Sequence, residues 1–278
     1  MKIKLSAILI YLLISPSAWA QSSLSIQFDY AEKLFNEKQY FDSITEFKRL
    51  LFIDSDGQYS YRANLLIGEC YKEGAKFDDA IKYFSFAAKN SNAPEENFEA
   101  RTQIIRTNIL RRTTDRALQL CDELDTDPAF VDKKDEINYW RGWAYIFADD
   151  WKNASLVFGR IDPNHELKIL AEKTEKAKVS VTCAKVISYI LPGAGAIYCG
   201  NFLSGLMSAG WNLLAGYWTM NSFAENRAFD GIVVGELVWL RFYRGAIQNA
   251  EEFAVEKNLK ISNQSLRYLQ NEYKGIKP

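Results

Sequence analysis

One arrangement of small, aromatic and apolar positions recurs along the chain at a fixed interval of 37 residues, without any gap. Each copy except the third opens on a small residue and continues into positions spaced i, i+4 and i+7, which form one face of a helix. The copies read Ala31, Ser43, Phe47, Leu50; Gly68, Ala80, Phe84, Ala87; Ile105, Ala117, Cys121, Leu124; and Gly142, Ala154, Phe158, Ile161. The pattern predicts four helical hairpins, each of which buries its apolar face only against its neighbours.

Further residues in the second and fourth copies keep the same register, with Tyr71 and Tyr145 three positions after the glycine. With these residues the chain closely resembles the tetratricopeptide repeat (TPR) family over about residues 24–164. The usual TPR period is 34 residues, so each copy here carries three more. The third copy departs from the family pattern, because Ile105 and Asn108 stand where the family has Gly and Tyr.

The TPR resemblance implies a binding groove. In that family the first helices of successive hairpins line a concave groove that binds peptides or protein segments. Carried onto this sequence, the groove positions are Phe28, Phe35, Leu65, Glu69, Thr102, Arg106, Tyr139, Trp143, Ile146 and Phe147. Tyr139 and Trp143 are the leading pair, since Tyr, Trp and Arg are enriched at binding hot spots. The alternative is that these aromatic residues belong to the core.

The composition changes after the repeats. Residues 165–180 predict a lysine-rich helix that caps the last hairpin, and residues 186–224 contain no charged side chain. On a soluble protein such a run would expose a large apolar patch. Residues 201–223 are long enough to span a membrane with some tilt. The alternative is a hydrophobic helix buried inside a soluble domain.

Two weaker apolar segments flank this one. Residues 179–191 include Lys185 and are too short to span, which favours an interfacial or re-entrant helix with the lysine directed toward water. Residues 229–247 form a weaker apolar helix that carries Glu236, Arg241 and Arg244. A charge at mid-membrane costs about 2.5–3.5 kcal/mol, so this segment spans only if those groups are paired or lie near an end.

The string LPGAGAIYCG from Leu191 to Gly200 has the pattern Pro-Gly-x-Gly-x-x-Tyr-x-Gly. It resembles the opening of a small membrane module of bacterial envelope proteins, sometimes found behind TPR repeats, and this resemblance implies location more than activity. We therefore expect an all-α chain. A TPR-like helical-hairpin solenoid over residues 21–164 would be followed by the capping helix, by a glycine-rich membrane-associated helical module over residues 181–258, and by an amphipathic tail helix over residues 259–278.

The first residues have the layout of a secretory signal peptide. Lys2 and Lys4 precede an apolar stretch from Leu5 to Ile14, and Ala18-Trp19-Ala20 supplies the small-x-small pattern of a cleavage site. Residues 1–20 are therefore expected to be removed on export, with an uncleaved N-terminal anchor as the alternative. Gln21 in place of a cysteine argues against a lipid-modified anchor.

Residues suited to catalysis or metal binding are few. The single histidine, His165, has no second histidine near it, so we predict neither a catalytic nor a metal site. No phosphate loop, dinucleotide fingerprint or nucleophile motif points to a cofactor. In an oxidising compartment Cys183 and Cys199 could form a disulfide, or both could be small packing residues. Cys70 and Cys121 are expected to be buried thiols.

Five arginines crowd into the third hairpin: Arg101, Arg106, Arg111, Arg112 and Arg116. A solvated helix face is the simpler interpretation. A basic patch that recognises carboxylates on a partner is the sharper one.

These features favour a binding protein over an enzyme. The net charge of −1 gives the whole chain no attraction to nucleic acid. The leading hypothesis is a scaffold of the bacterial cell envelope, with exported, periplasmic repeats that bind a partner protein and a C-terminal module that contacts membrane lipid. The alternatives are an assembly factor with transient partners and an enzyme with a site between the two modules. Lysines beside the membrane segment oppose the positive-inside tendency, so the topology stays open.

Overall fold

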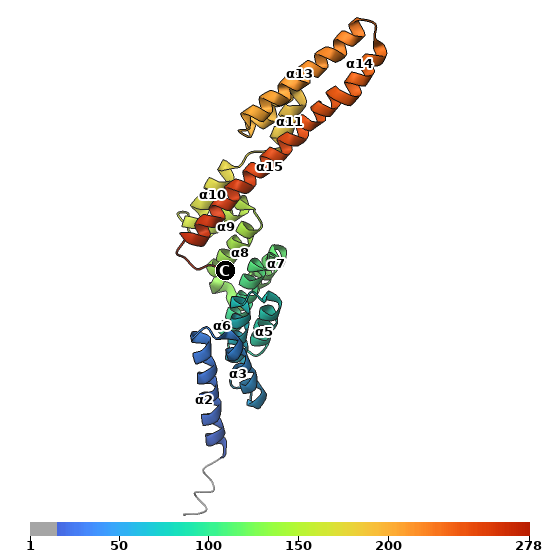
Figure 1. The fold of residues 1–278 in the computed structure, drawn as a ribbon. Helices are drawn as coiled ribbons and strands as arrows, with labels where there is room; N and C mark the ends of the chain where they lie inside the picture. Colours follow the sequence, from blue (N-terminus) through green and yellow to red (C-terminus); the bar gives the residue numbers. More distant parts are fainter. Residues whose placement is uncertain (1–15) are drawn as a thin grey trace, which may run out of the picture. The chain divides into compact units, whose positions relative to one another are not determined.

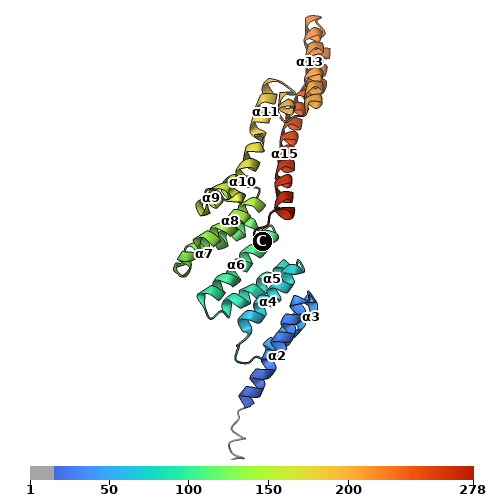
Figure 2. The same cartoon turned by 90° about the vertical axis from the view of Figure 1, so that its left-hand side faces the viewer.

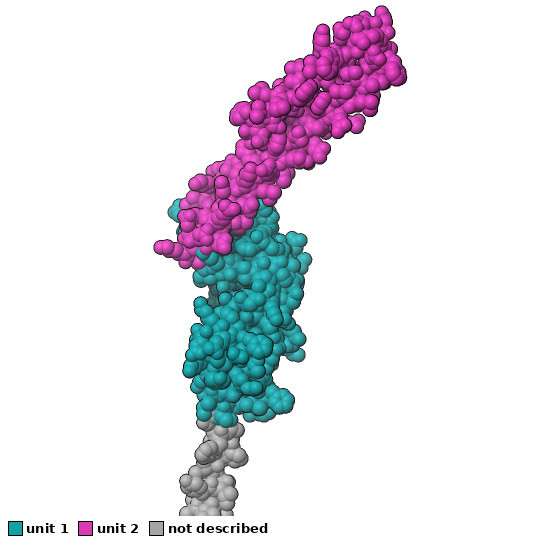
Figure 3. Space-filling view, in the orientation of Figure 1, with its two compact units in different colours: residues 1–168, 276–278 teal, residues 169–275 magenta. Residues whose placement is uncertain are grey.

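A computed structural model describes residues 16–278, and every regular element within that range is a helix (Figure 1). The expected all-α class is confirmed. The predicted signal peptide lies outside the described residues except for its last positions, where α2 (Pro16–Asn36) begins. The helices form two units, residues 1–168 with 276–278, and residues 169–275 (Figure 3).

In the first unit each helix packs against the next one along the chain (Figure 2). The first helices of neighbouring hairpins, α2, α4, α6 and α8, also contact one another in turn. After α2 come α3 (Tyr40–Ile53), α4 (Ser60–Glu73), α5 (Phe77–Lys89), α6 (Pro94–Leu110), α7 (Thr114–Asp125), the 3-10 helix η1 (Pro128–Lys133), α8 (Lys134–Phe147) and α9 (Trp151–Ile161).

The backbone of this unit repeats at the same interval of 37 residues. The first helix of each hairpin ends at Asn36, Glu73, Leu110 and Phe147, and the second begins at Tyr40, Phe77, Thr114 and Trp151. Each turn holds one non-glycine residue at positive φ, namely Lys38 (61°), Ala75 (55°), Arg112 (65°) and Asp149 (62°). The next amide donates to the carbonyl five residues earlier, as from Lys76 N to Tyr71 O at 2.8 Å. The four turns therefore share one geometry.

The glycine at the start of the second and fourth copies makes room for an aromatic ring. A Cβ on Gly68 would lie 2.5 Å from a ring carbon of Phe84, and a Cβ on Gly142 would lie 2.5 Å from Phe158. Both distances are shorter than any real contact, so the close approach of the two helices requires glycine at these positions.

The third hairpin reverses this arrangement of sizes. Ile105 is 1% exposed where the neighbouring copies have glycine, and Cys121 is fully buried where they have phenylalanine. A larger residue on the first helix is thus matched by a smaller one on the second, as close packing requires. Asn108, in place of Tyr, is held locally, because its amide donates to the Ile104 carbonyl at 2.8 Å and its carbonyl accepts from the Thr113 hydroxyl at 2.8 Å.

The second unit is built around one long helix. α10 (Glu166–Ala177) crosses the boundary between the units, and α11 (Val181–Ile190), α12 (Ala194–Tyr198), α13 (Phe202–Ala224), α14 (Ala228–Val234), the π-helix η2 (Gly235–Trp239) and α15 (Leu240–Asn271) follow. α15 packs against α11, α12, α13 and η2. The tail helix expected after residue 258 is the continuation of α15. None of the helices in residues 16–278, α13 among them, is both long and apolar enough to cross a membrane.

The glycines of the Pro-Gly-x-Gly motif stand where helices of the second unit pass closely. Gly193 has a φ of 96°, in the left-handed region that favours glycine, and a Cβ there would lie 2.2 Å from the Gly205 carbonyl oxygen. A Cβ on Gly195 would lie 2.2 Å from the Ala184 carbonyl oxygen and 2.6 Å from the Ala250 Cβ. The motif therefore allows α11, α12, α13 and α15 to pack together.

The structure bears on two local expectations for this unit. Cys183 and Cys199 are both free thiols, with Cys183 exposed and Cys199 buried beside α15, where its sulfur lies 3.8 Å from the Ala250 carbonyl oxygen. Cys199 is a packing residue, and no disulfide joins the two. Lys185 forms an ion pair with Glu251 at 2.9 Å, because α11 and α15 lie side by side.

Candidate interaction face on α4, α6 and α8

Three first helices bring a set of polar and aromatic side chains together. We call this set the α4–α6–α8 face, and its members are Glu69 and Lys72 from α4, Thr102, Gln103 and Arg106 from α6, and Tyr139 and Trp140 from α8. Glu69 and Lys72 lie three residues apart, and Thr102 and Gln103 lie four and three residues before Arg106, so each of these pairs is on one side of its helix. Tyr139 and Trp140 are adjacent in sequence, and their ring centroids lie 5.1 Å apart. Lys72 Nζ lies 2.7 Å from the Glu69 carboxylate and donates to Gln103 Oε1 at 3.0 Å, which links α4 to α6.

The Lys72 ammonium group is almost fully withdrawn from water, since its side chain is only 8% exposed. Burial lowers the pKa of Lys72, and the charge of Glu69 opposes that shift. A buried ion pair is weak evidence for stability, because desolvation offsets much of the Coulombic attraction. Buried charges with perturbed pKa values are instead frequent at functional sites.

Arg106 stands at the centre of the face. Its guanidinium carbon lies 4.7 Å from the centroid of the Trp140 ring, a cation–π arrangement that joins α6 to α8. Burial lowers the pKa of Arg106, while Glu69, Glu136 and Tyr139 oppose the shift. A guanidinium stays charged at neutral pH even so. Arg106 is therefore a fixed cation with several N–H donors.

Three buried polar atoms of the face have no hydrogen-bond partner among residues 16–278: Thr102 Oγ1, Arg106 Nε and Trp140 Nε1. Thr102 is 5% exposed and Trp140 is 3% exposed, so water does not reach them freely. Each such group costs about 1–3 kcal/mol when it is left unsatisfied. The three atoms belong to neighbouring side chains of the face, which therefore carries an unfavourable cost of desolvation.

The C-terminus of the chain lies against this face, and residues 276–278 belong to the first unit. Arg106 Nη2 donates to the Lys277 carbonyl oxygen at 2.9 Å, and the Tyr139 hydroxyl donates to the Ile276 carbonyl oxygen. The Ile276 side chain remains 66% exposed. The face therefore binds the main chain of this segment.

Of the predicted groove positions, Glu69, Thr102, Arg106 and Tyr139 are members of this face. Phe28 and Phe35 pack against the core of the first hairpin instead, and Phe28 stacks on Tyr59 with ring centroids 5.1 Å apart. Leu65 is part of the next core. These three side chains face inward because a hairpin buries its apolar residues against its neighbours.

The aromatic end of α8 is also mostly buried. Trp143 is 2% exposed and Ile146 is 1% exposed, so both contribute to packing. Phe147 lies under the guanidinium of Arg112, which is 4.6 Å from its ring centroid. Of the leading pair, Tyr139 donates a hydrogen bond to Ile276, and Trp143 is buried in the core.

Apart from Arg106, the arginines of the third hairpin have partners within the unit. The ion pairs are Arg101–Asp127, Arg111–Asp78 and Arg116–Glu123, and Arg112 donates to the Phe147 carbonyl. The simpler interpretation of a solvated, paired surface fits these contacts.

Sequence reasoning missed Lys72, Gln103, Trp140 and the contact of residues 276–278, which we call the tail. Lys72 lies three residues after Glu69, so the spacing of an i, i+3 ion pair could have found it. The tail could not be found in this way, because 171 residues separate Arg106 from Lys277.

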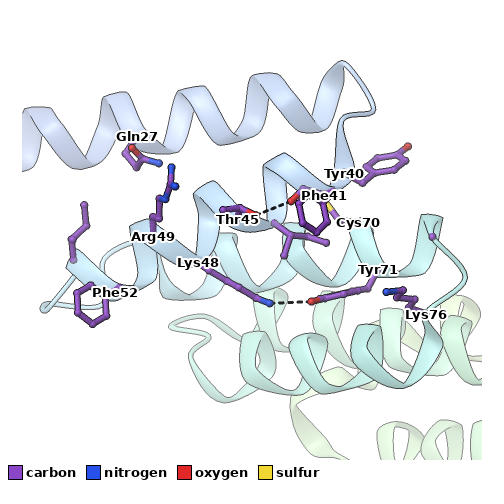
Figure 4. A pocket seen from close by; sticks show the side chains of 13 residues that line it. Gln27, Tyr40, Phe41, Thr45, Lys48, Arg49, Phe52, Cys70, Tyr71 and Lys76 are labelled. Atoms are coloured by element: carbon purple, nitrogen blue, oxygen red, sulfur yellow. Dashed lines mark hydrogen bonds between the residues drawn. The ribbon is translucent and has the colours of Figure 1, made fainter.

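A separate pocket of about 840 Å³ lies beside α3 in the first unit (Figure 4). Its lining combines aromatic and cationic side chains: Tyr40, Phe41, Phe52, Tyr71, Lys48, Arg49 and Lys76. Lys48 Nζ donates to the Tyr71 hydroxyl at 3.0 Å (Figure 4). None of the lining residues is acidic, so the pocket suits an apolar ligand with a negative charge.

His165 has a structural setting. Its ring stacks on Phe158 with centroids 5.1 Å apart, and its Nδ1 accepts the Leu167 amide at 3.1 Å. Within residues 16–278 no group of His, Cys, Asp and Glu side chains could hold a metal ion. Burial raises the pKa of the Cys70 thiol to about 11 and that of Cys121 to about 12, and both are the buried thiols expected.

No protein-family model, curated protein or solved structure matches the chain. The evidence on function therefore comes from the contacts of the α4–α6–α8 face.

Proposed function

We propose that this protein is a non-enzymatic scaffold of the cell envelope whose α4–α6–α8 face binds an extended segment of a partner protein. The observation that carries the proposal is the pair of hydrogen bonds from Arg106 and Tyr139 to consecutive main-chain carbonyls of the C-terminus. The regular hairpins that present these residues agree with the TPR-like solenoid expected from the sequence.

The second part of the proposal is that the second unit holds the protein at a membrane surface. Large apolar side chains of α13, α14 and η2 are exposed: Leu203, Leu206, Leu213, Met220, Phe229 and Leu237. Contiguous exposed apolar surface marks protein or membrane contact sites. The motif glycines that pack α12 against its neighbours fit the module that the Pro-Gly-x-Gly pattern resembles. Export by an N-terminal signal peptide belongs to the same proposal.

The test is affinity purification of the full chain in mild detergent, with co-purifying envelope proteins identified by mass spectrometry. Tyr139→Phe removes one donor with little change of shape, and Arg106→Gln replaces the guanidinium with a shorter, uncharged amide. The matched control is Arg116→Gln, which removes an arginine from the same hairpin away from the face. We expect a specific partner that the first two variants lose and the control retains. A partner that all variants retain would place the binding surface elsewhere, and no partner in any sample would contradict the stable scaffold.

A further inference from the structure

We infer that residues 276–278 are a built-in occupant of the α4–α6–α8 face and that a partner segment binds there by displacing them. The inference rests on the proposed function of this face and adds its regulation. It starts from the two donors, Arg106 and Tyr139, which the chain's own end already engages.

The contact with the tail is exchangeable. Both hydrogen bonds go to carbonyl oxygens, and the Ile276 side chain points to solvent for most of its surface. Every residue of an extended segment presents a carbonyl oxygen. Arg106 and Tyr139 can therefore donate to a segment of different sequence in the same way. A fixed structural clasp would be expected to bury its apolar side chain, because that burial is the main stabilising term in packing.

The tail also leaves the face incompletely satisfied. Arg106 Nε and Trp140 Nε1 are buried N–H donors without an acceptor, and the Thr102 hydroxyl is unpartnered beside them. A segment that replaces the tail and places carbonyl oxygens against these donors would gain hydrogen bonds that the tail does not make. The partner that fits is therefore an extended peptide segment with free main-chain carbonyls.

Tethering makes the tail an effective competitor for the face. α15 ends at Asn271, so only a short linker precedes Ile276. A short tether gives an effective concentration in roughly the millimolar range. A partner segment present at micromolar concentration must then bind about a thousandfold more tightly than the free tail to displace it. The tail thus sets the minimum affinity that a partner segment needs in order to bind the α4–α6–α8 face.

The experiment uses a fluorescein-labelled synthetic peptide of residues 272–278, EYKGIKP, and measures its binding by fluorescence anisotropy. The full chain is compared with a chain that ends after Gly275. We expect the shortened chain to bind the peptide at least about tenfold more tightly, because the tethered competitor is gone. A peptide of residues 272–275 should not bind to either chain.

Variants of the shortened chain locate the contact. Arg106→Gln and Tyr139→Phe should each weaken binding of the peptide by about five- to tenfold, as the loss of one hydrogen bond predicts. Arg116→Gln should leave the affinity unchanged. Thermal unfolding of the shortened chain is measured in parallel, and we expect its midpoint to match that of the full chain.

Three results would overturn the inference: equal affinity of both chains for the peptide, binding of the peptide of residues 272–275, or a destabilised shortened chain that binds nothing, which would identify a structural clasp. The proposed function fails separately. If the peptide does not bind but Arg106→Gln and Tyr139→Phe still lose an envelope partner, only the displacement is wrong. If the peptide binds as expected and no partner depends on those residues, the displacement stands and the scaffold does not.

Discussion

At the scale of single residues, the four hairpin turns rely on left-handed backbone at positions without glycine. Lys38, Ala75, Arg112 and Asp149 occupy this region at the same place in each copy. An L-residue there brings its Cβ close to the following carbonyl oxygen and costs roughly 1–2 kcal/mol. The turn hydrogen bonds and the packing of the two helices hold the residue in place despite that cost.

The first prediction concerns Ala75, since its φ is 55°. Ala75→Gly relieves the left-handed conformation and should raise the free energy of unfolding by about 0.5–1 kcal/mol. Ala75→Val should lower it by about 1 kcal/mol, because a β-branched side chain fits this region worst. Urea unfolding of the three proteins measures both changes. Equal loss in the two variants would mean that the methyl group of Ala75 matters more than the backbone.

The second prediction concerns pH. Burial lowers the pKa of His165 below its ordinary value, so the unfolded chain takes up a proton more readily than the folded one. The free energy of unfolding should therefore fall as the pH drops below about 6.5 and be unaffected by this group above it. His165→Asn keeps an acceptor for the Leu167 amide but does not titrate in this window. Chemical unfolding at pH 7.5 and 5.5 should show a smaller pH effect in the variant, and an equal effect would rule out this role of His165.

At the scale of elements, each hairpin pairs a residue on its first helix with one on its second. Two copies use glycine with phenylalanine, and the third uses Ile105 with Cys121. The helices can keep a similar separation only if the combined volume of the pair is maintained.

The third prediction tests this pairing. Gly68→Ala places a Cβ 2.5 Å from the Phe84 ring and should destabilise the protein by about 1–3 kcal/mol through overpacking. Phe84→Cys alone should destabilise it by about 3–5 kcal/mol through a cavity. The double variant should lose less than the sum, because the new side chain partly fills the space that the ring vacates. Thermal unfolding of the three variants supplies the comparison, and additive losses would contradict the pairing.

At the scale of the whole molecule, the two units expose different surfaces. Residues 186–224 contain no charged side chain, and the exposed leucines of α13 lie within this segment. The first unit also exposes single apolar residues, such as Val131 of η1 and Leu156 of α9. Scattered apolar residues are normal on a protein surface, whereas a continuous uncharged segment is not.

The fourth prediction follows from this difference. Leu206→Gln with Leu213→Gln should reduce co-flotation of the protein with phosphatidylcholine vesicles at least about tenfold, because each leucine contributes about 1.5–3 kcal/mol when buried in lipid. The matched control is Val131→Gln with Leu156→Gln, which removes two exposed apolar residues from the first unit and should leave flotation unchanged. Equal loss in both double variants would indicate unspecific adsorption.

The local features of this protein could be predicted from its sequence. The interval of 37 residues and the apolar stripes predicted the hairpins, because helical periodicity and turn position depend on neighbours within a few residues. The departures at Ile105 and Cys121 were visible too, although their compensation was not, since it depends on which side chains meet across two helices. Glu69, Arg106 and Tyr139 became candidates because the TPR resemblance implies groove positions that fall on them.

Other features were decided by tertiary structure. Whether Phe28, Leu65 and Trp143 face a partner or the core depends on how neighbouring helices pack, and the sequence pattern is the same in either case. The separation of Cys183 from Cys199 likewise depends on the path of α11 and α12. The placement of residues 276–278 against Arg106 and Tyr139 could come only from the folded chain, because periodicity carries no information about contacts between residues so far apart in sequence.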